Sequence, residues 1–184
     1  MRTAVIVIDM LVDYFRNPPL RDVRAPLVAA INRLTASARS QGWPIIWIRQ
    51  EFRSDLQDAF LAMRKKGIRI TLEGTEGCQL LPELNRVAGD HELVKKRYSA
   101  FFGTDLHDLL LRLEIQRLVV AGINTHACVR MTVIDAYQRD LEVTILRECV
   151  ASRDPEHHDI SLRYLAENIA DVQSLEDFLS GSST

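Results

Sequence analysis

Short apolar runs rich in β-branched residues alternate along this chain with segments of helical periodicity. The runs at residues 4–8 and 118–121 contain no polar side chain, which is typical of strands covered on both faces of a sheet. We predict strands at residues 4–8, 44–48, 92–94, 118–121, 143–146 and 171–174. Because helical segments separate them, the strands are expected to run parallel.

The segments between these strands carry apolar residues at helical spacing. Leucine, isoleucine and alanine at positions 27, 31, 34 and 38 share one face of a helix, which we expect Pro26 to open and Gly42 to close. Further helices are predicted near residues 106–113, 125–139 and 160–169, with Thr104 as a cap of the first. With right-handed crossovers, the pattern predicts a three-layer α/β/α sandwich around a parallel, Rossmann-like sheet of about six strands.

The domain organisation is simple. The 184 residues are enough for one sizeable core, and they contain no internal repeat or linker. We therefore expect a single domain over residues 1–184, with residues 180–184 as a frayed tail. The least regular stretch, residues 50–82, is expected to form one helix and a long loop over the sheet.

Charge and cysteine content narrow the functional class. A net charge of −2 gives no basis for binding nucleic acid or an anionic membrane surface. No apolar run approaches the roughly 20 residues of a membrane span, and the N-terminus leads into a strand rather than a signal peptide. Three widely spaced cysteines without a CxxC pair favour free thiols and a cytoplasmic location.

Cys128 is the most informative single residue. It follows the predicted strand at 118–121 and lies in the first turn of the next predicted helix. The N-terminus of a helix carries partial positive charge, which lowers the pKa of a thiol and favours the nucleophilic thiolate. The carboxyl end of a parallel strand is also where open α/β sheets place their ligands.

Two charged residues follow other strands in the same way. Asp9 ends the first strand, where it either caps a helix or turn or takes part in chemistry. Lys95 follows the third strand within Lys-Lys-Arg, which alone is typical of a solvated basic cluster. If the strands are neighbours, Asp9, Lys95 and Cys128 converge at one edge of the sheet, and this convergence favours a catalytic role for all three.

The chemistry of such a cluster is coherent. The sulfur attacks a carbonyl carbon, while the carboxylate takes the thiol proton and later returns it to a leaving nitrogen. The ammonium group stabilises both anions, and N–H groups at the start of the helix hold the oxyanion. These residues therefore predict acyl transfer to a thioester, followed by hydrolysis.

With these residues in view, the chain resembles the isochorismatase-like cysteine hydrolases, which include nicotinamidases, N-carbamoylsarcosine amidases and ureidoacrylate hydrolases. The resemblance covers nearly the whole chain, and the order and spacing of its segments make it specific. The segments are residues 7–10, 13–15, 74–77, 81–84, 95–101, 103–106 and 121–129. It implies that residues 1–184 form a single isochorismatase-like hydrolase domain.

The resemblance also implies site residues. The catalytic triad is Asp9, Lys95 and Cys128, with Lys95 chosen over Lys96 because the family lysine precedes Arg-Tyr-Ser by two positions. A cis peptide bond is implied between Ile123 and Asn124, and the backbone N–H groups of Asn124 and Cys128 are implied as the oxyanion hole.

Two departures from the family pattern bear on function. Leu11 stands where many relatives have glutamine two residues after the acid. Nicotinamidases carry an Asp-x-His metal motif after the second strand, whereas this chain has no histidine there. We therefore expect no metal and no other cofactor. Retention of Cys128 favours carbon–nitrogen hydrolysis over the vinyl-ether cleavage of true isochorismatases.

Further residues are expected to line the substrate pocket. They are Phe15, Trp47, Gln50, Tyr98, Thr125 and His126. Trp47 either walls the pocket or fills the core, and His126 either lines the pocket or is a polar residue of the first helical turn. Adjacent histidines at 157 and 158 are expected to be a solvated first turn rather than a metal site.

The sequence thus predicts a metal-independent cysteine hydrolase of a small amide or ureido/N-carbamoyl compound. The alternatives are an isochorismatase-type vinyl-ether hydrolase and a non-catalytic binding protein on the same fold. A small-molecule substrate is expected, with no nucleic-acid or membrane partner. The resemblance implies a homo-oligomer, either a dimer or a tetramer.

Overall fold

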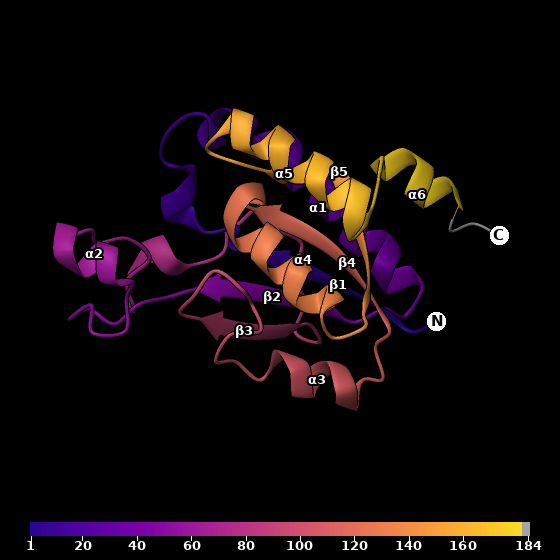
Figure 1. The fold of residues 1–184 in the computed structure, drawn as a ribbon, viewed down its shortest axis with the longest axis horizontal. Helices are drawn as coiled ribbons and strands as arrows, with labels where there is room; N and C mark the ends of the chain where they lie inside the picture. The colour runs from indigo at the N-terminus through magenta and orange to yellow at the C-terminus, as the bar shows by residue number, and fades with distance from the viewer. Residues whose placement is uncertain (182–184) are drawn as a thin grey trace.

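The computed structural model of the chain describes residues 1–181, and it contains one parallel sheet of six strands (Figure 1). The strands are β1 (Thr3–Ile8), β2 (Ile45–Gln50), β3 (His91–Lys95), β4 (Arg117–Ile123), β5 (Glu142–Ala151) and β6 (Asp171–Gln173). Their order across the sheet is β3-β2-β1-β4-β5-β6, and every neighbouring pair is parallel. The predicted α/β fold is confirmed.

Helices cover both faces of the sheet and complete three layers. They are α1 (Leu20–Ser40), α2 (Leu61–Lys66), α3 (Leu106–Arg112), α4 (Arg130–Tyr137), α5 (Pro155–Asn168) and α6 (Leu175–Gly181). Apolar side chains of α1 and α6 pack on one face, and those of α3, α4 and α5 pack on the other. Helix α2 lies away from the sheet, at the left of Figure 1.

Strand β1 shows why the first apolar run is unbroken. Val5 and Val7 face the layer of α1, whereas Ile6 and Ile8 face the opposite layer. All four side chains are fully buried, because a central parallel strand has no face in contact with water.

Helix α1 differs from the prediction at its start. It begins at Leu20, so Pro26 lies inside the helix instead of opening it. Leu20 and Leu27 are seven residues apart and both buried in the same core cluster. This packing carries the helix through a proline that lacks the N–H needed for a helical hydrogen bond.

Two other boundaries also differ. The helix predicted at residues 125–139 is a π-helical turn, Thr125–Val129, followed by α4. Residues 180 and 181 belong to α6, so the predicted tail does not begin at residue 180, and residues 182–184 lie outside the described part of the chain. Phe178 of α6 is buried against the core, which gives this last helix a packing partner.

The sheet brings the ends of three strands to one edge. Ile8 of β1 pairs in register with Gly122 of β4, and Lys95 ends β3 opposite Gln50 of β2. Gly122 has a φ of +110°, and a Cβ there would lie 2.0 Å from the carbonyl oxygen of Ile8. Glycine therefore permits the close approach of the two central strands beside the site.

Within residues 1–181, no helix is long and apolar enough to cross a membrane.

Candidate active site

The three predicted reactive side chains meet at the carboxyl edge of the sheet. The Nζ atom of Lys95 lies 2.6 Å from Oδ2 of Asp9 and 3.4 Å from Sγ of Cys128. Strands β1 and β4 are neighbours, but β2 separates β3 from β1. The long lysine side chain spans this gap, so the convergence does not require all three strands to be adjacent.

Asp9 occupies a fixed position directly after β1. Its N–H donates to the carbonyl of Ile48 at 2.9 Å, and its own carbonyl accepts from the N–H of Leu11 at 2.8 Å. Its φ of +55° turns the chain sharply at the end of the strand. The side chain is 1% exposed and pairs with Lys95, so Asp9 is not a simple helix cap.

Lys95 is a buried cation whose charge is compensated locally. Its side chain is fully buried, and Nζ also donates to the carbonyl of Arg97 at 3.0 Å. Burial opposes the charged form, but the charges and hydrogen bonds of Asp9 and Cys128 together outweigh this effect, and the pKa of Lys95 is raised. The ammonium form is therefore retained. Lys96 instead points to the surface and pairs with Asp58 at 3.1 Å.

The state of the Cys128 thiol differs from the sequence-based expectation. Burial raises the pKa of Cys128 to about 12, although Lys95 acts in the opposite direction. The negative charge of Asp9 adds to the increase. Loss of hydration therefore outweighs the predicted effect of the helix N-terminus, and the resting side chain is a neutral thiol next to a carboxylate.

The backbone before the thiol is shaped around Asn124. The peptide bond between Ile123 and Asn124 is cis. The Asn124 carbonyl accepts from the N–H groups of Ala127 at 3.0 Å and Val129 at 3.2 Å. Its own N–H has no hydrogen-bond acceptor among residues 1–181, which leaves this donor for a bound group. The role of the Asn124 and Cys128 N–H groups as an oxyanion hole stays a prediction.

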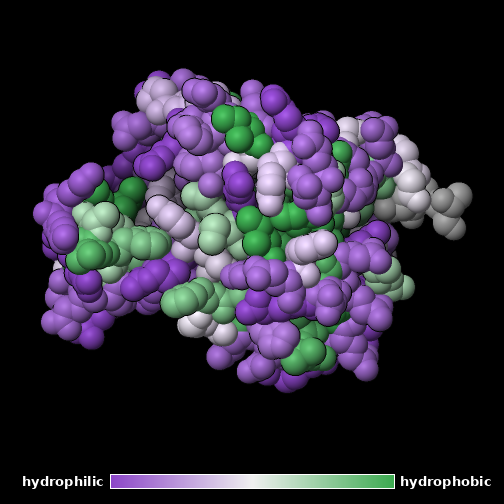
Figure 2. Space-filling model, viewed as in Figure 1, coloured by the Kyte–Doolittle hydropathy of each residue, from purple (hydrophilic) through white to green (hydrophobic). Residues whose placement is uncertain are grey.

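A cavity of about 350 Å³ opens beside Cys128. Three of the predicted pocket residues, Gln50, Tyr98 and His126, line it together with Asn124 and Cys128. The remaining lining residues are Tyr14, Phe60, Ala62, Met63, Lys66, Ile68, Ile70, Ala127 and Arg153. Figure 2 shows apolar side chains gathered over the α2 segment, at the left of the view, and this segment forms the outer wall of the cavity.

Three predicted pocket residues do not line this cavity. Phe15 and Trp47 belong to the core cluster on the α1 side of the sheet. Strand β2 turns alternate side chains to opposite faces, and this places the indole N–H of Trp47 2.8 Å from Asp90. Thr125 is fully buried, and its hydroxyl donates to the carbonyl of Ala151 at 3.0 Å. These three predicted residues are therefore not among those that line the cavity.

Sequence reasoning missed Tyr14, the segment from Phe60 to Ile70, and Arg153. The hydroxyl of Tyr14 donates to Gln50, and burial and then the charge of Asp9 raise the pKa of Tyr14. Tyr14 follows Asp9 by little more than one helical turn, and this spacing is the sequence feature that indicates a position near the site. No periodicity in the irregular stretch indicates that residues 60–70 fold toward the thiol.

His126 is held at the cavity by a neighbouring loop. Its Nδ1 lies 2.5 Å from the hydroxyl of Ser152. Burial and then the charge of Arg153 lower the pKa of His126, which keeps the imidazole neutral near pH 7. Lys95 contacts both Asp9 and the thiol, which places Asp9 beside Cys128 as the better proton acceptor.

Other reactive side chains lie elsewhere. Cys78 and Cys149 are buried and unpaired, and burial raises the pKa of Cys149 to about 12. His157 pairs with Asp154, and His158 contacts Thr125. Among the residues that the structure describes, no group of three or more His, Cys, Asp and Glu side chains is arranged to hold a metal ion.

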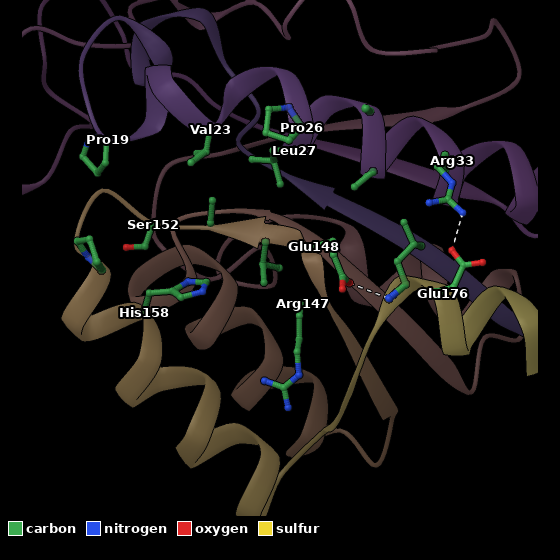
Figure 3. Close-up of a pocket in the computed structure, with 16 residues that line it drawn as sticks. Pro19, Val23, Pro26, Leu27, Arg33, Arg147, Glu148, Ser152, His158 and Glu176 are labelled. Carbon is green, nitrogen blue, oxygen red and sulfur yellow. Dashed lines mark hydrogen bonds and ion pairs between the residues drawn. The ribbon is translucent and has the colours of Figure 1, made fainter.

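A second and larger hollow lies on the α1 side of the molecule. This groove has a volume of about 710 Å³ and lies between α1, the end of β5 and the starts of α5 and α6 (Figure 3). Val23 and Leu27 contribute apolar walls, whereas Arg33 is paired with Glu176 at 2.9 Å. We refer to it as the α1 groove.

Comparisons with known proteins match nearly the whole chain. The family model of the Isochorismatase domain matches residues 3–177. A protein of Arabidopsis thaliana described as a probable inactive nicotinamidase is 32% identical over 168 residues, covering 87% of this chain and 86% of its own length.

Solved structures show the same arrangement. An isochorismatase family protein from Desulfovibrio vulgaris matches with a TM-score of 0.88 at 26% identity, covering 99% of this chain and 98% of that one. N-carbamoylsarcosine amidase from Thermoplasma acidophilum matches with a TM-score of 0.82 at 26% identity, covering 96% of this chain and 98% of that one.

Proposed function

The chain belongs to the isochorismatase family, and from this premise we propose that it is a cysteine hydrolase that cleaves a carbon–nitrogen bond of a small amide, ureido or N-carbamoyl compound. The observation that carries the proposal is the buried cluster of Asp9, Lys95 and Cys128, in which Cys128 lines a cavity. A buried ion pair is costly to desolvate, and its position beside a thiol favours function over stability as its reason.

The reaction begins from the neutral thiol. As Sγ of Cys128 attacks the substrate carbonyl carbon, Asp9 accepts the thiol proton and Lys95 stabilises the negative charge on both groups. The carbonyl oxygen becomes an oxyanion near the N–H groups of Asn124 and Cys128. Collapse of this intermediate breaks the C–N bond, and Asp9 returns the proton to the leaving nitrogen.

Hydrolysis of the thioester completes the cycle. Water attacks the thioester carbon while Asp9 accepts one of its protons. The C–S bond then breaks, the acid product forms, and the proton returns to sulfur. Each group is thus restored, and the reaction needs only water as a second reactant.

Two observations bear on the alternatives. The name of the Thermoplasma acidophilum protein is that of an amidase, and this supports C–N hydrolysis over vinyl-ether cleavage. The Arabidopsis thaliana relative is described as probably lacking activity, and this keeps a non-catalytic binding protein as the second candidate. Against it, a binding protein has no use for a cavity that ends at a thiol paired with a buried carboxylate.

The test is a substrate screen with a covalent readout. Primary amides, N-carbamoyl compounds and ureas are incubated with the protein, and ammonia release is measured. Mass spectrometry of quenched reactions is expected to find an acyl adduct on Cys128. Turnover that persists in Cys128→Ala would refute the thioester mechanism, and a vinyl-ether substrate turned over by that variant would favour the first alternative.

The remaining expectations are also proposals. We propose that the protein is cytoplasmic and that it is a homo-oligomer, either a dimer or a tetramer. Light scattering of the purified protein measures the assembly directly, and a monomer at micromolar concentration would contradict the second part.

A further inference from the structure

The cavity beside Cys128 carries two cations and no carboxylate among its lining residues. Lys66 and Arg153 line it, and no Asp or Glu does. Neither cation has an ion-pair partner among residues 1–181. An exposed lysine or arginine is ordinary by itself, but two on the wall of one cavity give it a local positive potential.

Acidic groups near this cavity are engaged by other residues. Asp58 pairs with Lys96 at 3.1 Å, and Asp13 pairs with Arg16 at 3.0 Å. Asp154, next to Arg153 in the chain, caps α5 by accepting a hydrogen bond from the N–H of His157 at 3.0 Å. None of these carboxylates lines the cavity or forms an ion pair with Lys66 or Arg153.

The two cations come from opposite walls. Lys66 ends α2 on the outer wall, whereas Arg153 follows β5 on the wall that carries the thiol. The N–H of Arg153 donates to Oδ1 of Asn124 at 2.8 Å, which fixes this backbone beside the predicted oxyanion hole. A ligand group held by Arg153 is thus separated from the reacting carbonyl by only a few atoms.

Between the cations the wall is largely apolar. Phe60, Met63, Ile68 and Ile70 line it, and the ring of Phe60 lies 4.7 Å from that of Tyr98. Such a surface favours an apolar body over a purely polar one.

We propose that the substrate is an amide or ureide with a compact apolar body and a carboxylate, and that Lys66 and Arg153 recognise this carboxylate. The inference rests on the proposed function, because it names the class of substrate for the same site. A guanidinium binds a carboxylate through two parallel hydrogen bonds, while a lysine supplies a mobile point charge. Arg153 is therefore expected to contribute more than Lys66.

The first test compares paired substrates. An N-carbamoyl amino acid with an apolar side chain is compared with its neutral carboxamide, using kcat/KM. Arg153→Gln is expected to lower the acid-to-neutral preference roughly tenfold and Lys66→Gln roughly threefold, as partly exposed charge pairs allow. Arg163→Gln and Lys65→Gln are the matched controls, since neither residue lines the cavity, and each should leave the preference unchanged.

The second test does not need turnover. Cys128 is alkylated with iodoacetate and with iodoacetamide, which differ in charge but little in shape, and peptide mass spectrometry follows each rate. The rate with iodoacetate is divided by the rate with iodoacetamide, and this ratio is divided by the same ratio measured for glutathione. We expect the normalised ratio to be well above one in the native chain and in both controls. It should fall in Arg153→Gln and Lys66→Gln, and it should decrease with added salt.

The two tests separate the two proposals. Failure of every amide to turn over, together with a charge-selective alkylation, would overturn the hydrolase and retain the anion-recognising cavity. Conversely, amide turnover with no acid preference, or a normalised alkylation ratio near one in the native chain, would overturn the carboxylate inference alone. Absence of labelling by both reagents even at pH 10, where a larger fraction of the thiol is ionised, would also overturn it, since the cavity would then not reach Cys128.

Discussion

The α1 groove and the cavity beside Cys128 differ in size and in what lies at their base. The α1 groove is about 710 Å³ and is lined mainly by apolar side chains, with its Arg33 neutralised by Glu176 (Figure 3). The cavity beside Cys128 is about 350 Å³ and ends at a buried thiol, carboxylate and ammonium group. A search for the active site by volume and apolarity alone would choose the α1 groove, whereas the buried thiol, carboxylate and ammonium group indicate the smaller cavity.

The two thiols with raised pKa values, Cys128 and Cys149, extend the comparison. Burial raises the pKa of both Cys128 and Cys149 to about 12. Cys128 has Lys95 and Asp9 as neighbours and lines the cavity, whereas Cys149 lies in the core beneath α1. The pKa therefore does not distinguish the proposed nucleophile, and the difference lies in the neighbouring charged groups and in access to the cavity.

The largest expected effect is the loss of the thiol at the smaller cavity. Cys128→Ala should lower kcat by a factor on the order of 10⁴–10⁶, because no other group forms the covalent intermediate. Cys149→Ala is the matched control and should keep kcat, with some loss of stability from a core cavity. Steady-state kinetics and thermal unfolding of both variants measure the contrast. Equal loss in the two variants would mean that folding, not chemistry, is affected.

The next effect separates the buried lysine from its neighbour. Lys95→Ala leaves Asp9 buried without its ion pair, so it should cost about 3–5 kcal/mol of unfolding free energy and reduce kcat at least about 10²-fold. Lys96→Ala removes a partly exposed pair with Asp58 and should cost about 0–1 kcal/mol with little change in kcat. Urea unfolding and kinetics test both. An active, fully stable Lys95→Ala variant would contradict the assignment.

A third prediction concerns pH. A thiol with a pKa near 12 has a thiolate fraction that rises tenfold per pH unit below that value, so alkylation of Cys128 should rise about 10³-fold between pH 7 and pH 10. Cys149 should stay unlabelled throughout, since it is fully buried and lines no cavity near the reagent. An alkylation rate of Cys128 that stops rising near pH 8 would instead support the lowered thiol pKa expected from the helix N-terminus.

The smallest effects on kcat/KM are expected for residues between the α1 groove and the smaller cavity. Ser152 lines the α1 groove, and its hydroxyl also contacts His126 of the smaller cavity. Ser152→Ala should change kcat/KM only a few-fold, because it alters the orientation of a lining side chain rather than a reacting group. Val23→Ser, in the same groove, should leave kcat/KM unchanged. A large effect of Val23→Ser would give the α1 groove a role in catalysis.

Local patterns accounted for the fold and for the reactive centre. Strands such as β1 were predictable because burial on both faces demands an unbroken apolar run. The convergence of Asp9, Lys95 and Cys128 was predictable because each lies at or after the end of a strand, and the ends of parallel strands share one edge. The boundary of α1 was not, because the burial of Leu20 beside Leu27 carries the helix through Pro26.

Long-range packing determines which residues surround Asp9, Lys95 and Cys128. Trp47 and Gln50 belong to the same strand, yet only Gln50 faces the cavity, while Trp47 finds Asp90 on the opposite side. The segment 60–70 reaches the thiol by a path that has no local periodicity. Contacts of this kind depend on which distant segments fold together.

The sequence by itself determined the order of strands and helices and the types of residue that end three of the strands. Only the tertiary structure decided that Lys95 reaches across β2, that Lys66 and Arg153 share a cavity, and that Cys128 is a neutral thiol. The reason is physical: secondary structure follows from short-range periodicity, whereas ionisation depends on how completely the assembled fold excludes water from a group.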